Sequence, residues 1–317
     1  MDLELFRQIL SMDSTSGKEA AVADFLLEHL DAPSKQAFEV GDGTRNLLFQ
    51  WGEPKVVFCS HMDTVPPYIG PDFREDGVWG RGSCDAKGQV FCMYSACKIL
   101  EARGCSGFGL LLLSGEETGS WGAKAFARLP FRADVLVIGE PTDNCMVRNC
   151  KGTKSFDLVF KGEAFHSGYP QFGRSAVEMF VDFVQGLREQ GFNYNVGLLK
   201  SENPQNILSP ELSCRIYFRT TAQDDAAVVE WMGRDYENIS ISARGGDSPA
   251  EYLALEGFDS KDVAFGSDAP HLSNFQRKAI CGPGSITVAH RDDEHILYSD
   301  MEKAVDNYCR MFETLTR

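Results

Sequence analysis

Residues 55–63 read KVVFCSHMD, a short apolar run that ends in a histidine and an aspartate. A continuous apolar run of this length is typical of a strand that is buried on both faces of a sheet. Two similar runs follow, GLLLLS at 109–114 and ADVLVIG at 133–139, and a helical pattern over 88–102 precedes them. Apolar strands with helices between them predict an α/β fold, a parallel or mixed sheet covered on both faces as a three-layer domain.

The sequence pattern changes near residue 152. Strands with alternating burial are expected at 155–161 and 212–220, and amphipathic helices at 174–190 and 223–234. This pattern predicts a small α+β domain inserted into the first one.

We therefore expect a catalytic domain over 1–151, an inserted domain over 152–246, and a return to the catalytic domain over 247–317 that ends in a helix at 300–315. Ser16 and Glu19 fit a capping box, which predicts a helix over 17–30.

The composition excludes several classes of protein. The 317 residues are 43% hydrophobic and carry a formal net charge of −15, as expected of a globular enzyme and not of a nucleic-acid-binding surface rich in Lys and Arg. No apolar run approaches the roughly 20 residues of a membrane span, and the acidic start MDLELFRQIL lacks the features of a secretory signal. The ten scattered cysteines favour reduced thiols over a disulfide framework, which predicts a cytoplasmic protein.

Polar residues of metal-ligand type follow each apolar run. Active sites of open α/β sheets form beyond the carboxyl ends of the strands, so these positions are expected to converge. They are His61 and Asp63, Glu116 and Glu117, Glu140, and, from two further loops, Asp85 and His290.

Each of these residues alone has an ordinary structural explanation. A histidine after a strand is usually a satisfied loop residue, and paired glutamates often begin a solvated helix. Two histidines with three of these carboxylates at one sheet edge nevertheless suit zinc, and they offer too few oxygens for a dedicated calcium site.

Five segments together resemble one family. They are SHMDTVP (60–66), WGRGSCDAKG (79–88), SGEETG (114–119), GEPT (139–142) and AHRDDE (289–294). In this order they are similar to the co-catalytic zinc amidohydrolases and metallopeptidases, which include acetylornithine deacetylase, succinyl-diaminopimelate desuccinylase, aminoacylase and carboxypeptidase G. The resemblance spans nearly the whole chain and looks closest to the acetylornithine deacetylase branch.

The resemblance implies two zinc ions per chain, with cobalt as a possible substitute. Asp85 would bridge them, His61 and Glu140 would complete one site, and Glu117 and His290 the other. It also implies a cis peptide between Asp85 and Ala86.

Three residues are expected to act in catalysis. Glu116 matches the general base that takes a proton from a metal-bridged water and passes it to the leaving amine. Asp63 would accept the second ring N–H of His61, since the two side chains point the same way on an extended segment. His166, in a segment resembling the Ala-His-Ser of the family, would reach the active site of a partner chain and polarise the substrate carbonyl.

Substrate binding is assigned to a further set of residues. Asn206 and Arg219 would hold the carboxylate of the substrate, with Arg215 as the alternative arginine. Ser267, Asp268 and Gly284 match loops of the family that line the substrate pocket. The resemblance also implies that the inserted domain is ferredoxin-like and serves as a lid and as the dimer interface.

The resemblance predicts hydrolysis of the amide bond of an N-acyl amino acid, such as an acetyl or succinyl intermediate of arginine or lysine biosynthesis, by a homodimer. A dipeptidase or carboxypeptidase of the same family is the alternative, with the same chemistry on a peptide bond. A binding protein that has kept the scaffold and lost the reaction is a third possibility. We expect neither a nucleic acid nor a membrane as a partner.

Overall fold

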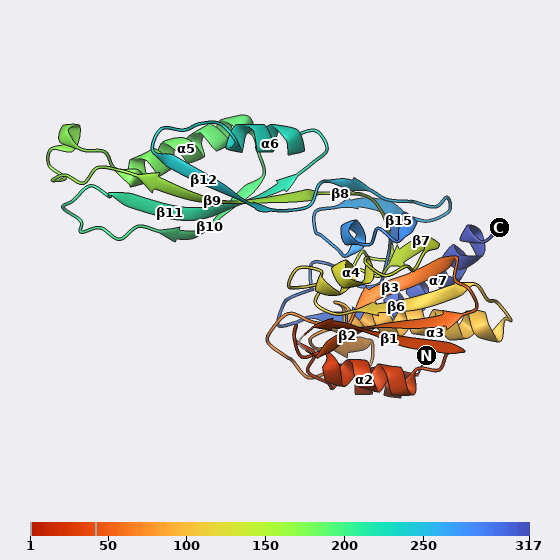
Figure 1. The fold of residues 1–317 in the computed structure, drawn as a ribbon. Coiled ribbons are helices and arrows are strands. Elements are labelled where there is room, and N and C mark those ends of the chain that lie inside the picture. The colour runs from red at the N-terminus through yellow and green to blue at the C-terminus, as the bar shows by residue number, and fades with distance from the viewer. Residues whose placement is uncertain (1, 42) are drawn as a thin grey trace. The chain divides into compact units, whose positions relative to one another are not determined.

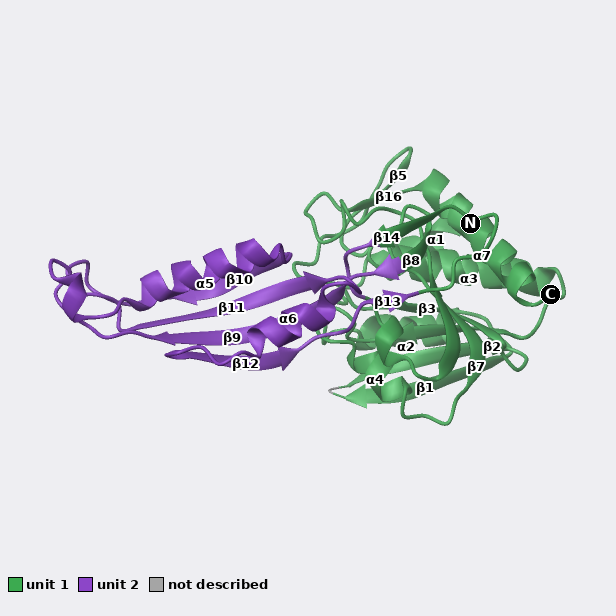
Figure 2. Cartoon of the chain, turned by 90° about the horizontal axis from the view of Figure 1, so that it is seen from above, with its two compact units in different colours: residues 1–148, 252–262, 267–317 green, residues 149–251, 263–266 purple. Residues whose placement is uncertain are grey.

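The computed structural model describes residues 2–41 and 43–317 as two compact units. Unit 1 comprises the chain up to residue 148 together with 252–262 and 267–317, and unit 2 comprises 149–251 and 263–266 (Figure 2). Unit 2 is thus inserted between segments of unit 1. The sequence-based division at 152 and 246 differs from these bounds by a few residues, and it assigned 247–251 and 263–266 to the first domain.

Unit 1 is built on a six-stranded sheet with the order β1-β2-β6-β3-β7-β15 (Figure 1). The strands are β1 (Ser34–Gly41), β2 (Thr44–Trp51), β3 (Val56–His61), β6 (Phe108–Leu113), β7 (Ala133–Ile138) and β15 (Phe275–Ile280). The last four in the sheet order are parallel, and β1 and β2 form an antiparallel edge. The sheet is therefore mixed, and the carboxyl ends of β6, β3, β7 and β15 lie at one edge.

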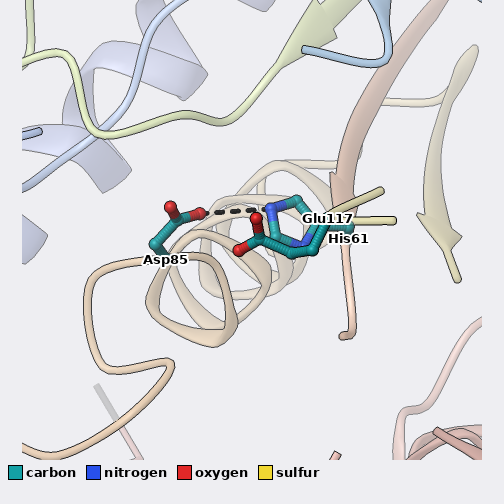
Figure 3. Close-up of side chains that lie close together, drawn as sticks. All are labelled: His61, Asp85 and Glu117. Atoms are coloured by element: carbon teal, nitrogen blue, oxygen red, sulfur yellow. Dashed lines mark hydrogen bonds and ion pairs between the residues drawn. The ribbon is translucent and has the colours of Figure 1, made fainter. Parts of the chain in front are cut away.

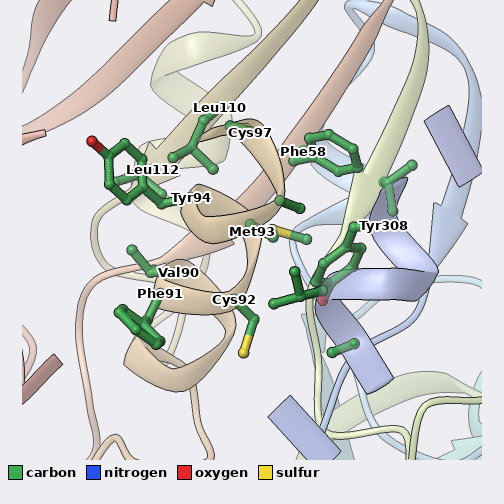
Figure 4. Close-up of a cluster of buried hydrophobic side chains, with 14 of the residues drawn as sticks. Phe58, Val90, Phe91, Cys92, Met93, Tyr94, Cys97, Leu110, Leu112 and Tyr308 are labelled. Carbon is green, nitrogen blue, oxygen red and sulfur yellow. The ribbon is translucent and has the colours of Figure 1, made fainter. Parts of the chain in front are cut away.

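One face of this sheet is covered by four helices. They are α1 (Leu3–Leu10), α2 (Ala20–His29), α3 (Lys87–Ala102) and α7 (Tyr298–Leu315), and their apolar side chains join the sheet in one buried cluster. At its centre, Phe58 of β3 meets Tyr308 of α7 edge to face, beside Met93 of α3 (Figure 4). On the other face lies α4 (Trp121–Phe126), whose Phe126 contacts Phe38 of β1.

Further short elements are formed by residues of both units. A three-stranded sheet contains β16 (His295–Leu297), β5 (Gly77–Trp79) and β4 (Asp72–Phe73), and another contains β13 (Ala250–Glu251), β8 (Met146–Cys150) and β14 (Ser260–Val263). The single-turn helices are η1 (Pro170–Phe172) and η2 (Ala269–His271).

Unit 2 is a four-stranded antiparallel sheet with two helices on one face. Its elements are β9 (Gly152–Lys161), α5 (Ala176–Gln190), β10 (Tyr194–Lys200), β11 (Glu211–Thr220), α6 (Asp225–Met232) and β12 (Ile239–Gly245). The sheet order β10-β11-β9-β12 with βαββαβ connectivity is the ferredoxin-like arrangement. Alternate strand residues such as Phe160 and Phe218 join the helices in one buried cluster, in which Phe160 packs against Phe183 and Phe183 against Trp231.

The predicted fold class is confirmed: a mixed α/β domain carries an inserted α+β domain. The helix predicted over 17–30 is present as α2, but the predicted capping box is wrong, because the helix begins at Ala20 and has no side-chain cap. The Ser16 hydroxyl donates instead to Asp63, and the Glu19 carboxylate accepts the N–H groups of Gly17 and Gly115. These contacts tie the start of the helix to the sheet edge.

All ten cysteines lie in the described part of the chain, and within it none of them forms a disulfide. Of the helices formed by residues 2–41 and 43–317, none combines the length and the apolar character needed to span a membrane.

Candidate active site

The candidate site lies at the carboxyl edge of the parallel strands in unit 1. His61 is the last residue of β3, Glu116 and Glu117 follow β6, and Glu140 follows β7. Asp85 directly precedes Ala86, the N-cap residue of α3. Because neighbouring parallel strands end at the same edge, the fold brings these side chains together from distant parts of the sequence.

Asp85 is at the centre of this cluster. Its Oδ1 lies 3.1 Å from His61 Nε2, and its Oδ2 lies 3.1 Å from His290 Nε2. His290 Nε2 is also 2.9 Å from Glu117 Oε1. Donor atoms of His61, Asp85 and Glu117 all lie within 4.8 Å of one another, a spacing that suits a shared cation (Figure 3). The Asp85–Ala86 peptide is cis, as the family resemblance implies.

Asp63 is a fully buried carboxylate that holds several parts of the site. It accepts the Ser16 hydroxyl at 2.8 Å and the backbone N–H groups of Glu116 and Glu117 at 3.0 and 3.1 Å. His61 Nδ1 lies 3.0 Å from the Asp63 carbonyl oxygen and 3.4 Å from its carboxylate. The carboxylate is thus near the ring, as expected, but the backbone carbonyl is the nearer acceptor.

Charge and burial shift the pKa values of the site residues in opposite directions. Burial alone would raise the pKa of Asp85, but the hydrogen bonds from His290 and His61 hold it well below its usual range. The hydrogen bonds that the His290 ring donates to Asp85 and Glu117 raise the pKa of His290 to about 10. The hydrogen bonds to Asp63 and Asp85 likewise raise the pKa of His61 despite its burial, so a cation bound between these groups would compete with protons for the histidine nitrogens.

The pKa values of two glutamates, Glu116 and Glu140, are raised, unlike that of Asp85. Burial raises the pKa of Glu116 well above its usual value, and the charges of Asp268, Glu117 and Asp85 add to the effect. Glu140 is buried, and burial followed by the charges of Asp85 and Glu116 raises its pKa as well. A carboxyl group with a raised pKa can exchange a proton near neutral pH, as a general base must.

The three predicted pocket residues of unit 1 differ in their surroundings. Asp268 is buried, its Oδ1 has no hydrogen-bond partner among the described residues, and burial raises its pKa to about 6. The Ser267 hydroxyl accepts the Ala269 N–H at 3.3 Å. Gly284 has φ +72°, and a Cβ there would lie 2.5 Å from Cys84 Sγ, so glycine is required beside the Asp85 loop.

The predicted residues of unit 2 fall at two ends of its sheet. The backbone N–H of Ser167, next to His166, donates to the Asn206 carbonyl, so these two loops lie together beyond the Lys161 end of β9. Arg219 pairs with Thr153 at the other end of the sheet. From Glu211 to Arg219 the strand rises about 26 Å, so within one chain Arg219 is far from the other two.

Arg215, the alternative arginine, already has a partner. Its Nε and Nη2 donate to the two carboxylate oxygens of Asp157 at 2.7 and 3.1 Å. A bidentate pair of this kind leaves the guanidinium less able to bind a substrate carboxylate.

Sequence reasoning gave no role to Arg81 and Glu294, which form a buried ion pair beside the site. Both stand inside motifs quoted for the resemblance, and no local pattern indicates that they are partners. Ser16 and Glu19 were assigned only to a helix cap, although both contact segments of the site.

The donor set suits divalent cations. Asp85 offers one oxygen on the side of His61 and the other on the side of His290, and Glu140 and Glu117 supply one further carboxylate each. Each group of one histidine and two carboxylates has the nitrogen and oxygen ligands that catalytic zinc uses. Besides burial, the charges of Asp85 and Glu116 raise the pKa of Glu140, and a bound cation would offset this repulsion.

A known protein family matches most of this chain. Residues 57–314 match peptidase family M20/M25/M40. The chain belongs to this family. As a family member it is a hydrolase that acts on amide or peptide bonds, and the predicted peptidase-family resemblance is confirmed, whereas the acetylornithine deacetylase branch stays a prediction.

Relatives and solved structures align with nearly the whole of this chain. A probable carboxypeptidase from Aspergillus oryzae is 29% identical, over 98% of this chain and 86% of its own length. The fold is similar to that of a tripeptidase from Staphylococcus aureus, with a TM-score of 0.84, 16% identity and coverage of 99% and 97% of the two chains. It is also similar to a Bacillus subtilis dinuclear metal-binding peptidase, with a TM-score of 0.72, 12% identity and coverage of 99% and 96%.

Proposed function

We propose that the protein hydrolyses the amide bond on the amino side of an amino acid whose carboxylate is free, using two divalent cations bridged by Asp85. The supporting observation is the position of that carboxylate, with one oxygen 3.1 Å from each of His61 and His290. Two zinc ions are the proposed occupants, held by His61 and Glu140 on one side and Glu117 and His290 on the other.

The bound ions would supply Lewis acidity and lower the pKa of a water molecule. Glu116 would accept the proton of the attacking water and donate it to the leaving amine. Its raised pKa suits both steps, and the bond from its backbone N–H to Asp63 fixes the start of its side chain.

Two substrate classes share this bond. The similarity of 267–269 and 289–294 to the acetylornithine deacetylase branch favours an N-acyl amino acid with an acetyl or succinyl group. The names of the relatives favour a carboxypeptidase or dipeptidase, since a probable carboxypeptidase aligns with 98% of the chain. In either case a carboxylate remains beside the scissile bond.

A substrate panel tests the proposal. The protein, loaded with zinc or cobalt, would be assayed on acetyl and succinyl amino acids, on dipeptides, and on the same compounds with the carboxylate amidated. Turnover of one class, lost on amidation, would support the proposal. Equal turnover of the amidated compounds would contradict it, and dipeptide turnover without deacylation would assign the protein as a peptidase. A protein that retains both ions but hydrolyses no member of the panel would be a binding protein.

A homodimer is the second part of the proposal. His166 and Asn206 lie at one end of the unit 2 sheet and Arg219 at the other, about 26 Å away, which is further than one small substrate extends. If all three contact the substrate, two chains must supply them. His166 is exposed, as a group that serves a partner chain must be.

Mixing two inactive variants tests the action of His166 across chains. Glu116→Gln and His166→Ala each disable one part of the site, but a mixed dimer contains one site with both wild-type residues. We expect about a quarter of wild-type activity after the two chains are exchanged at equal concentration. No recovery, despite exchange shown by a mass tag, would contradict action across chains.

A further inference from the structure

Arg81 and Glu294 form an ion pair that is almost completely buried, with 1% and 0% of their side chains exposed. Arg81 lies four residues before the bridging residue Asp85, and Glu294 lies four residues after His290. The pair therefore joins the loops that carry these two proposed metal ligands.

Glu294 determines the backbone of the Asp85 loop. Its Oε1 accepts three backbone N–H groups, from Gly82 at 2.9 Å, Cys84 at 3.1 Å and Asp85 at 3.0 Å. Three donors can converge on one oxygen because the loop curls around it, and Gly82 takes the left-handed conformation (φ +82°) that this curl needs. The N–H of the bridging residue itself is thus fixed by a side chain from the His290 loop.

Arg81, which lies in the Asp85 loop, in turn holds the backbone of the His290 loop. Its Nη1 donates both to Glu294 Oε2 and to the carbonyl oxygen of Arg291, the residue after His290. His290 has φ +64°, a left-handed conformation that is unfavourable for a residue with a side chain and persists where the surroundings hold it. The contact from Arg81 to the next carbonyl provides such a constraint.

A buried ion pair is a weak source of stability, because desolvation offsets most of its attraction. Its geometric effect here is specific, since the four hydrogen bonds to the Glu294 carboxylate come from Arg81, Gly82, Cys84 and Asp85. Groups that orient metal ligands typically change metal affinity about 10- to 100-fold when they are removed.

We propose that Glu294 and Arg81 are positioning residues that set the distance between Asp85 and His290 and thereby the affinity for the bridged cations. The proposal rests on the metal centre of the proposed function. It extends that function by assigning part of the metal affinity to a pair that contacts neither ion.

Cobalt titration tests the proposal. Metal-free wild-type protein, Glu294→Gln and Arg81→Lys would be titrated with Co²⁺ by calorimetry and by visible absorption. We expect Glu294→Gln to weaken Co²⁺ binding about 10- to 100-fold and to alter the cobalt spectrum, because the amide places an N–H against Arg81. Arg81→Lys keeps the carboxylate and the charge, and should cause a smaller loss in the same direction.

Asn274→Ala is the matched control for a purely structural effect. Asn274 is also buried in unit 1, and its side chain donates to the carbonyls of Phe126, Leu129 and Phe131. It precedes β15, about 20 Å from the carboxyl edge of the sheet, so its removal should lower the melting temperature and leave Co²⁺ affinity within twofold.

The outcomes separate this inference from the function on which it rests. Glu294→Gln and Arg81→Lys proteins that bind Co²⁺ within twofold of wild type, with an unchanged spectrum, would overturn the positioning role and leave the metal centre standing. If Glu294→Gln does not fold, Arg81→Lys decides alone. A wild-type protein that binds no Co²⁺ would overturn the metal centre and the inference together.

Discussion

Replacing Asp63 with asparagine should destabilise unit 1 by several kcal/mol. The carboxylate accepts Ser16 Oγ and Glu117 N–H on Oδ2, and Glu116 N–H on Oδ1. The best orientation of the asparagine amide keeps its oxygen at the Oδ2 position and turns its NH₂ group toward Glu116 N–H. One bond is then lost and a buried donor is left unsatisfied.

The magnitude follows from these contacts. An unsatisfied buried donor costs about 1–3 kcal/mol, and the two surviving bonds lose their charge assistance at about 1 kcal/mol each. We therefore expect Asp63→Asn to lower the free energy of unfolding by about 3–5 kcal/mol. Ser16→Ala removes one of the three bonds and should cost about 1.5 kcal/mol.

Urea unfolding of the metal-free protein at pH 7.5 measures both changes. Three of the four tryptophans, Trp51, Trp79 and Trp121, lie in unit 1, so fluorescence reports mainly on this unit. If Asp63→Asn were no more destabilising than Ser16→Ala, Asp63 would not be the residue that holds the site together.

Three further predictions concern catalysis, protonation and unit 2. Glu116→Gln should lower kcat by about 10²- to 10⁴-fold with its metal content unchanged, and a loss below tenfold in steady-state assays would remove Glu116 as the base. In the metal-free protein, the raised pKa of His290 adds stability that is fully present below pH 6.5 and is lost as the pH rises through about 10. The melting temperature should therefore fall more steeply between pH 6 and pH 10 for wild type than for His290→Ala. Parallel curves for the two proteins would contradict this assignment. Phe218 is fully buried and contacts Phe156, Phe192 and Tyr194, so Phe218→Ala should destabilise unit 2 by about 3–5 kcal/mol. Hydrogen exchange of the backbone amides in β9 and β11 measures this change. Faster exchange in β3 and β6 would be the contrary result.

The sequence was sufficient to predict the strands that carry the site. The apolar runs at 55–60, 109–114 and 133–139 correspond to β3, β6 and β7, because strands buried on both faces have a nearly continuous apolar pattern. Once these strands are parallel, their carboxyl ends meet at one edge. The convergence of His61, Glu117 and Glu140 therefore follows from a local pattern and a general rule.

Long-range pairing of polar side chains could not be predicted in the same way. Arg81 and Glu294 are 213 positions apart, and neither belongs to a periodic pattern. Ser16 and Glu19 have the spacing of a capping box, but tertiary contacts with Asp63 and Gly115 replace the local bonds. The separation of Arg219 from Asn206 depends on the register of β11 against β9, which their spacing along the chain does not specify.

The most direct measurement of the central claim is anomalous diffraction from crystals grown with zinc, with data on both sides of the zinc edge. We predict two peaks, each about 2.0–2.2 Å from one carboxylate oxygen of Asp85, with His61 and Glu140 at one ion and Glu117 and His290 at the other. Peaks remote from Asp85, or a single ion that leaves His61 or His290 unliganded at saturating zinc, would contradict the proposed binuclear centre.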